Sequence, residues 1–122
     1  MNVIKSQELN MIKIHKDDKN FYMGFIESLN SLKNKKNVLK FPGFEEITEQ
    51  FVSPCEYVIE WKSLTSHQRE KLQKLYNCVL DYYRDNKTDE EIAADPEWHK
   101  ICSLAEEVYK ELKDVEYISE SE

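Results

Sequence analysis

The chain has 122 residues, of which 40% are hydrophobic and 34% are charged, and its formal net charge is −7 at pH 7. This length is typical of one domain with one hydrophobic core. The chain contains two glycines. This excludes the Gly-rich phosphate loops of dinucleotide-binding, P-loop and kinase-type proteins, which need several glycines for close backbone approach.

Cysteine usage and hydrophobicity bear on the compartment. No apolar run approaches the ~18 residues that span a membrane, and the first residues lack the apolar stretch of a signal peptide. Cys55, Cys78 and Cys102 are odd in number and widely spaced, unlike the disulfide framework of a small secreted domain. We therefore expect reduced thiols, a cytoplasmic location and no contact with a membrane.

The N-terminal segment predicts a strand followed by a helix. Ile12 and Ile14 alternate with polar residues over residues 10–15, as in a half-buried strand. Apolar residues then recur at helical spacing from Phe21 to Leu32, after two aspartates that can cap a helix.

A basic, Asn-rich turn, Lys33–Lys40, follows the predicted helix. Val38–Phe41 is predicted as a second strand, because Pro42 and Gly43 would end it. Residues 44–52 fit either a short helix or an irregular connection, and the sequence leaves both open.

The segment Cys55–Lys62 has the clearest strand pattern in the chain. Cys55, Tyr57, Ile59 and Trp61 alternate with residues that would point to the opposite face. Aromatic and β-branched side chains favour a pleated, half-buried surface. We therefore expect a third strand here.

The second half of the chain has the apolar period of helices. Helix starts are marked by the capping-box spacings Thr65–Gln68 and Thr88–Glu91, and by Asp95 followed by Pro96. The stripes Leu72–Tyr83 and Trp98–Leu112 then predict two amphipathic helices, with a short helix that ends near Ala94 between them.

Together these elements predict an α+β fold. A small sheet of about three strands from the N-terminal half packs with one helix, and an amphipathic helical hairpin forms the C-terminal half. We expect a single domain over residues 1–114 and a mobile acidic tail over residues 115–122. The two stripes of the hairpin offer more apolar surface than a small sheet covers, which also allows a homodimer.

Local patterns supply no catalytic, cofactor-binding or metal-binding residues. His99 and Cys102 stand one helical turn apart, but a zinc site needs three or four ligands, and no CxxC, HxxxH or HExxH pattern supplies the others. A GxSxG nucleophile elbow does not occur. Adjacent carboxylates such as Glu106 and Glu107 diverge by ~100° around a helix axis. We therefore expect a protein that is not an enzyme and uses neither a cofactor nor a metal.

The acidic charge is concentrated near the C-terminus. Residues 1–87 hold 14 Lys and Arg against 12 Asp and Glu, whereas residues 88–122 hold 3 Lys against 12 Asp and Glu. Such asymmetry bears on partners and on electrostatic steering rather than on the fold. It favours docking on a protein with a basic surface, such as one that normally holds nucleic acid.

Exposed tyrosines beside carboxylates suit a protein–protein contact, because the ring buries area at low entropic cost and the hydroxyl tolerates a wet rim. The leading hypothesis is a small non-catalytic acidic protein that binds, and inhibits or modulates, a basic nucleic-acid-handling protein. Inhibitors and immunity proteins of phages and mobile elements are often acidic domains of this size. The predicted partner-binding residues are Tyr82, Asp89, Glu90, Glu91, Glu106, Glu107, Tyr109 and Glu111.

Two alternatives stay open. A nucleic-acid or transcription accessory factor would use the basic turn Lys33–Lys40 to contact phosphates, with Phe41 and Phe44 as stacking groups. The negative net charge opposes direct nucleic-acid binding. An enzyme whose site leaves no local motif is the other alternative.

Overall fold

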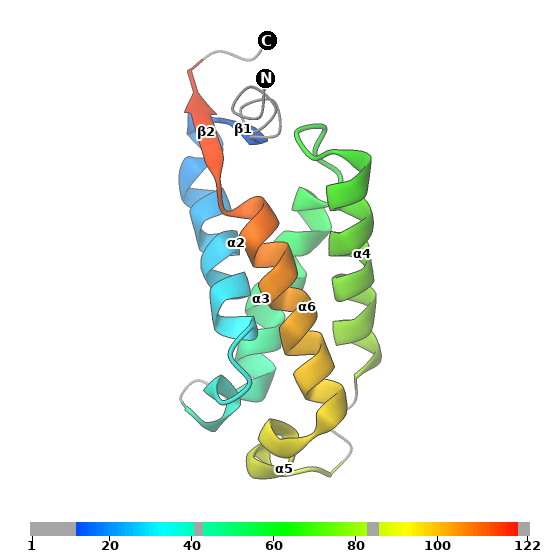
Figure 1. Ribbon diagram of the computed structural model, residues 1–122. Coiled ribbons are helices and arrows are strands. Elements are labelled where there is room, and N and C mark those ends of the chain that lie inside the picture. The colour runs from blue at the N-terminus through cyan, green and yellow to red at the C-terminus, as the bar shows by residue number, and fades with distance from the viewer. Residues whose placement is uncertain (1–11, 41–42, 83–85, 120–122) are drawn as a thin grey trace, which may run out of the picture.

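The computed structural model describes residues 12–40, 43–82 and 86–119. Four long helices run along the molecule, with a small sheet at one end and a short helix, α5, at the other (Figure 1). In chain order the elements are β1 (Ile12–His15), η1 (Lys16–Asp18), α2 (Lys19–Leu32), η2 (Asn37–Leu39), α3 (Phe44–Val58), α4 (Ser66–Asp81), α5 (Asp89–Ala94), α6 (Pro96–Leu112) and β2 (Val115–Ile118).

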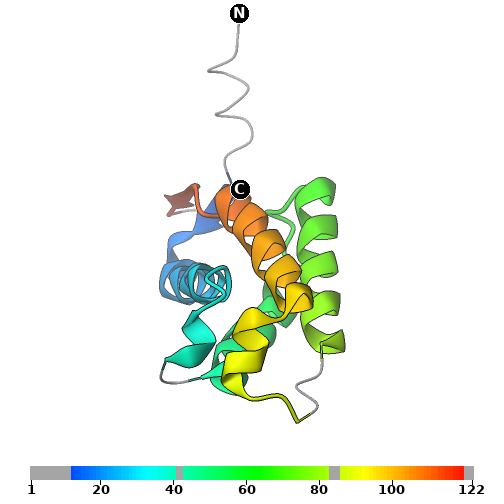
Figure 2. The same ribbon diagram turned by 60° about the horizontal axis from the view of Figure 1, so that its bottom comes forward.

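The long helices α2, α3, α4 and α6 form an antiparallel bundle. The contacts follow a ring in which α2 packs on α3, α3 on α4, α4 on α6 and α6 on α2. Successive long helices point in opposite directions along the molecule (Figure 1), as in an up-down-up-down bundle. Figure 2 shows α2 and α4 on either side of α6. Each helix therefore buries one apolar face against two neighbours.

The sheet differs from the one predicted. In the described residues it has two parallel strands, with Ile12 opposite Val115 and His15 opposite Ile118. β1 confirms the predicted N-terminal strand from Ile12 onward, but its partner comes from the other end of the chain. Residues 115–118, expected in an acidic tail, form β2 instead, since the tail carries apolar side chains that pack beside the core. An α+β class is compatible with this mostly helical chain; a three-stranded sheet from the N-terminal half is not.

The predicted strand Cys55–Lys62 is wrong. Its first four residues complete α3, which begins at Phe44, so the stretch left open is helical as well. The buried residues of α3 recur every three or four positions: Phe44, Ile47, Phe51, Cys55 and Val58. Tyr57, which the alternation placed on the same face as Cys55, is 66% exposed, whereas Cys55 and Val58 are fully buried. A helix over residues 44–58 thus buries more apolar surface than a strand with the alternating pattern would.

The predicted strand Val38–Phe41 is also wrong. Asn37–Leu39 is a 3-10 turn in which Val38 is buried and Leu39 is 47% exposed. Two asparagine side chains stabilise the turn: Asn34 Oδ1 accepts from the Lys36 amide, and Asn37 Nδ2 donates to the Ser31 carbonyl. Such local bonds compete with strand pairing. Phe41 itself lies outside the described residues.

The predicted helical hairpin is confirmed. Thr65 with Gln68 and Thr88 with Glu91 form complete capping boxes, and the Asp95 side chain caps α6. The predicted stripes are buried within the bundle, apart from half-buried Tyr76 and Leu104 and from Tyr83, which lies outside the described residues. The surplus of apolar surface that would allow a homodimer is thus covered by α2 and α3. None of the described helices combines the length and apolar character of a membrane span.

Candidate functional site

Tyr82, one of the predicted contact residues, has a structural role. Its hydroxyl donates a hydrogen bond to Asp95 Oδ2 over 2.6 Å, and its ring lies 5.3 Å from that of Trp98 and 5.9 Å from that of Phe44. Burial, and next the hydrogen bond to Asp95, raise the pKa of Tyr82 well above its usual range. The half-buried ring therefore joins the end of α4 to the start of α6 and leaves only part of its area for a partner.

The carboxylates of α5 lie at one end of the bundle. Glu90 is exposed, whereas Asp89 is half-buried and takes part in a further interaction. Glu91 Oε1 accepts from the Thr88 amide over 2.8 Å, so this carboxylate caps its own helix. Capping and the favourable charge at a helix N-terminus explain much of this acidic run.

The carboxylates near the end of α6 are engaged with cations. Glu107 Oε1 lies 3.3 Å and Glu111 Oε2 2.6 Å from Lys71 Nζ, and the hydrogen bond that Lys71 donates to Glu111 raises the pKa of Lys71. Glu106 pairs with Lys110 at 3.6 Å on the surface. The structure thus brings Glu107 and Glu111 together, around a lysine of α4.

Tyr109 faces a different neighbour from Glu107 and Glu111. It is half-buried, and the Lys33 ammonium lies 5.4 Å from its ring centroid, on the α2 side of α6. The acidic turn of α5 and the last turns of α6 lie towards opposite ends of the bundle (Figure 1). The eight predicted residues are therefore spread over several surfaces.

An acidic surface that the sequence analysis missed lies on α3. The helix contains four exposed glutamates and no Lys, Arg or His: the glutamates are Glu45, Glu46, Glu49 and Glu56. Within the described part of the chain none of them forms an ion pair; Glu46 accepts from Gln50 Nε2, and Glu56 accepts from the Tyr76 hydroxyl. The signal was the absence of any basic residue between Phe41 and Trp61. The charge count over residues 1–87 hides this segment, because it adds the basic residues before and after it.

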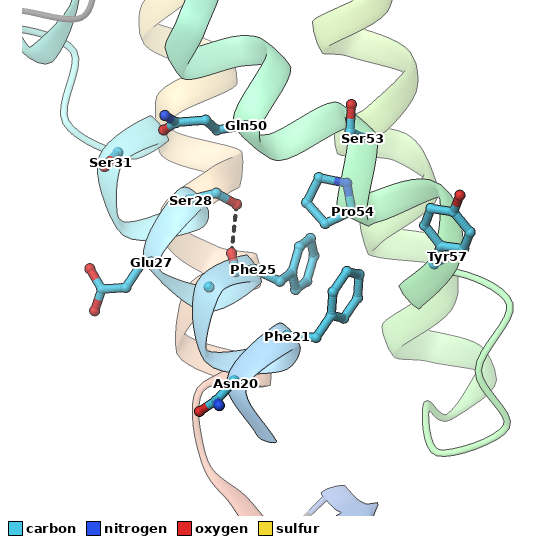
Figure 3. A pocket seen from close by; sticks show the side chains of 11 residues that line it. Asn20, Phe21, Phe25, Glu27, Ser28, Ser31, Gln50, Ser53, Pro54 and Tyr57 are labelled. Atoms are coloured by element: carbon cyan, nitrogen blue, oxygen red, sulfur yellow. Dashed lines mark hydrogen bonds between the residues drawn. The ribbon is translucent and has the colours of Figure 1, made fainter. Parts of the chain in front are cut away.

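A groove of about 490 Å³ lies beside this helix, between α2 and α3. Figure 3 shows the rings of Phe21, Phe25 and Pro54 turned towards one another across it. Phe21 is 42% exposed, and its ring meets that of Tyr57 edge to face with centroids 6.3 Å apart. The lining residues are Asn20, Phe21, Gly24, Phe25, Glu27, Ser28, Ser31, Gln50, Ser53, Pro54 and Tyr57.

Small and rigid residues keep the groove open. A Cβ placed on Gly24 would have no neighbour within 4 Å. Ser28 is turned back to its own helix, where its hydroxyl donates to the Phe25 carbonyl over 2.6 Å. On the opposite wall Pro54 stands inside α3 and cannot donate the helical hydrogen bond to the Gln50 carbonyl. Large apolar rings are therefore exposed next to backbone that another chain can approach closely.

Replacing Gly24 by alanine is expected to raise the free energy of unfolding by about 0.5–1 kcal/mol, because glycine in a helix interior is disfavoured by that amount. The open space at this position accommodates the methyl group. Urea denaturation of the two proteins measures the difference. A lower stability in the variant would show that the position is strained or crowded, against the geometry described above.

The charge in the groove lining is negative. Among the described residues around it Glu27 is ionisable at neutral pH, and neither Lys, Arg nor His contributes to its walls. By contrast, a hollow of about 740 Å³ between α4 and α6 is lined by charges of both signs, such as Lys74, Lys100 and Glu97. The α2–α3 groove is thus the more apolar of the two and is acidic at its edge.

Cys102 and His99, the pair considered above for zinc, are buried and half-buried, and Cys55 is buried as well. Burial raises the pKa of Cys55 and of Cys102 to about 12, so both thiols stay protonated at neutral pH, unlike the thiolates that act as nucleophiles or metal ligands. His99 Nε2 is hydrogen-bonded to the Ala93 carbonyl. Within residues 12–40, 43–82 and 86–119, no group of three or more His, Cys, Asp and Glu residues is placed to hold a metal ion.

The basic turn keeps part of its charge free for a ligand. Lys35, Lys36 and Lys40 are exposed, whereas Lys33 lies over the Tyr109 ring. Phe44, expected to stack on bases, is 8% exposed and packs 5.2 Å from Trp98. The turn therefore lacks this aromatic platform, and the other expected stacking residue, Phe41, lies outside the described residues.

Comparisons of the chain with protein-family models, with curated protein sequences and with solved structures gave no match.

Proposed function

We propose that this chain is a small, non-catalytic protein that binds a basic protein partner through α3 and the adjoining α2–α3 groove. The observation that carries this proposal is a helix, α3, whose charged side chains are all glutamates, beside a groove with exposed aromatic rings. Phe21 and Tyr57 stand at the groove and Glu46 lies next to its lining residue Gln50, whereas Glu45 and Glu49 line a hollow on the α4 side of the same helix. Exposed aromatic side chains are enriched at the centres of interfaces, where they supply most of the binding energy.

The charges on α3 favour a basic partner. An incoming Lys or Arg side chain meets carboxylates such as Glu45 and Glu49 that hold no cation among the described residues. At Glu107 and Glu111 the same side chain would have to compete with Lys71. The proposal therefore keeps the partner suggested by the sequence and places the centre of the contact on α3.

A basic surface that handles nucleic acid fits this chemistry. Such surfaces present Lys and Arg side chains that bind phosphates. The glutamates of α3 would offer these cations another negatively charged partner. Occupying that surface would inhibit or modulate the partner. Complementary charge would mainly speed the association and select the partner.

Reversing two charges on α3 and one in the turn that follows it is expected to weaken partner binding by roughly 10–100-fold at low ionic strength, because each exposed ion pair contributes about 0.2–1 kcal/mol and reversal adds repulsion. The variant carries Glu46→Lys and Glu49→Lys on the helix and Glu60→Lys after its end, all at exposed positions. The partner is first captured with a photo-crosslinking amino acid at position 49. Its dissociation constant is then measured over a salt series.

The matched control is a variant with Glu106→Lys, Glu107→Lys and Glu111→Lys, which changes the net charge equally. A crosslinker at position 70, on the outer side of α4, is the control for the capture step. We expect near wild-type affinity for the α6 variant. Loss of binding in the α6 variant alone would return the contact to the residues predicted from sequence, and equal loss in both would contradict a site on α3. Circular dichroism checks the fold of each variant.

A further inference from the structure

We infer that the α2–α3 groove receives one amphipathic helix of the partner, with an apolar stripe flanked by Lys or Arg. This inference rests on the proposed function and specifies the form of the partner at that site. The argument uses the shape of the groove, the exposed rings and the sign of the charges around it.

The shape of the groove favours a helix. Both walls are helices, so neither offers the unpaired strand edge that an extended peptide would need for backbone pairing. The lining on α2 extends from Asn20 to Ser31, which is about 16 Å at 1.5 Å per residue. Three turns of a partner helix cover this length. Its side chains at positions i, i+4 and i+7 would then point into the groove.

The groove surface suits aliphatic anchors. Phe25 forms part of its floor, and the absence of a side chain at Gly24 allows close approach of another backbone. Phe21 is held from behind by Trp61, with ring centroids 5.9 Å apart, and from the side by Tyr57. Leucine-sized side chains that pack on the exposed parts of the Phe21 and Tyr57 rings would cover apolar surface that is now exposed to water.

The charges around the groove favour Lys and Arg beside the anchors. Glu27 stands on the α2 side, and Glu46 lies on the α3 side, next to the lining residue Gln50. The exposed faces of Phe21 and Tyr57 can also attract cations. A second copy of this chain would bring its own Glu27 and Glu46 to the same place, where like charges repel. Charge complementarity therefore favours a basic partner helix over self-association.

The test uses a synthetic amphipathic peptide of about 14 residues, with Leu on one face and Lys on the others. Its controls are a peptide with Glu in place of Lys and a scrambled peptide of the same composition. Amide chemical shifts of the full-length protein are recorded during titration. We expect the Leu/Lys peptide alone to bind, with shifts concentrated at positions 20–31 and 50–57.

Three variants then locate the contact. Gly24→Leu fills the groove and Tyr57→Ala removes an exposed ring, and each is expected to weaken binding of the Leu/Lys peptide by at least about tenfold. Met23→Ala, at an exposed position of α2 outside the lining, is expected to change it by less than about twofold. Unfolding curves show whether each variant is folded.

Several results would overturn the inference. They are equal binding of the scrambled peptide, shifts centred on α5 and α6, unchanged affinity of Gly24→Leu, or a dimer in sedimentation that Tyr57→Ala dissociates. The proposed function fails separately. If charge reversal on α3 weakens binding of the captured partner while Gly24→Leu leaves it unchanged, the proposed function stands and the inference of a helix-binding groove is wrong.

Discussion

Replacing Phe51 by alanine is expected to lower the free energy of unfolding by about 3–5 kcal/mol. Phe51 is fully buried, and its ring stacks on that of Phe25 with centroids 6.0 Å apart and planes 22° apart. This pair joins α3 to α2 beneath the groove. Truncation removes buried apolar area and leaves a cavity that neighbouring helices fill only in part. Urea denaturation followed by circular dichroism measures the loss.

Two variants bracket this expectation. Phe51→Leu keeps most of the apolar volume and is expected to cost less than Phe51→Ala, while Tyr57→Ala on the same helix removes an exposed ring and is expected to cost about 1 kcal/mol or less. A domain of this size has a total stability of roughly 6–18 kcal/mol, so Phe51→Ala removes a large share. A loss below about 1.5 kcal/mol would mean that the Phe25–Phe51 contact is not central to the bundle.

Replacing Asp95 by alanine is expected to lower the free energy of unfolding by about 2–4 kcal/mol. Its carboxylate caps α6 by accepting from the Glu97 amide over 3.0 Å, and it also accepts from the Tyr82 hydroxyl and from Lys87 Nζ at 2.6 and 2.9 Å. Loss of a cap costs about 0.5–2 kcal/mol, and a partly buried hydroxyl left without its partner adds about 1–3 kcal/mol. Thermal or urea unfolding provides the measurement.

The same carboxylate makes stability depend on acid pH. The hydrogen bond from Tyr82, then those from Lys87 and the Glu97 amide, hold the pKa of Asp95 at about 2, below its ordinary value of 3.8. Because the folded-state pKa is lowered, the contribution is complete above about pH 4 and is lost as the pH falls through about 2. The Asp95→Asn variant keeps a capping oxygen but cannot ionise. We expect the difference in stability between wild type and this variant to shrink over that range; a constant difference would contradict the assignment.

The helices of the second half could be predicted because their signals are local. The capping boxes of Thr65 and Thr88 and the Asp95–Pro96 pair specify three helix starts, and each agrees with the structure. In contrast, residues 55–62 carry two apolar patterns at once. The alternation of Tyr57 with its neighbours suggests a strand, but the stripe from Phe51 through Cys55 to Val58 is the one that the bundle buries.

Features that depend on tertiary packing could not be predicted from local patterns. β1 and β2 are four residues each, and nothing in Ile12–His15 indicates a partner at residues 115–118. The groove likewise exists only because α2 packs on α3. The sequence shows the aromatic residues of the groove, but the local patterns place Phe21 in the apolar spacing of one helix and Tyr57 in a strand, with no sign that the two rings meet. The acidic face of α3 followed from the sequence only once residues 44–58 were known to be helical.

The pairing of β1 with β2 has a consequence for the order of folding. These strands lie at opposite ends of the described chain, so joining them early would require closing a very long loop, with a large loss of chain entropy. The bundle removes most of that loss by bringing the ends together, helped by the hydrogen bond from the Tyr22 hydroxyl to the Leu112 carbonyl over 2.8 Å. We therefore expect the sheet to form late in folding, on a nearly complete bundle. Its four pairs of opposed residues then join the segment before α2 to the segment after α6, the first and the last long helices of the bundle.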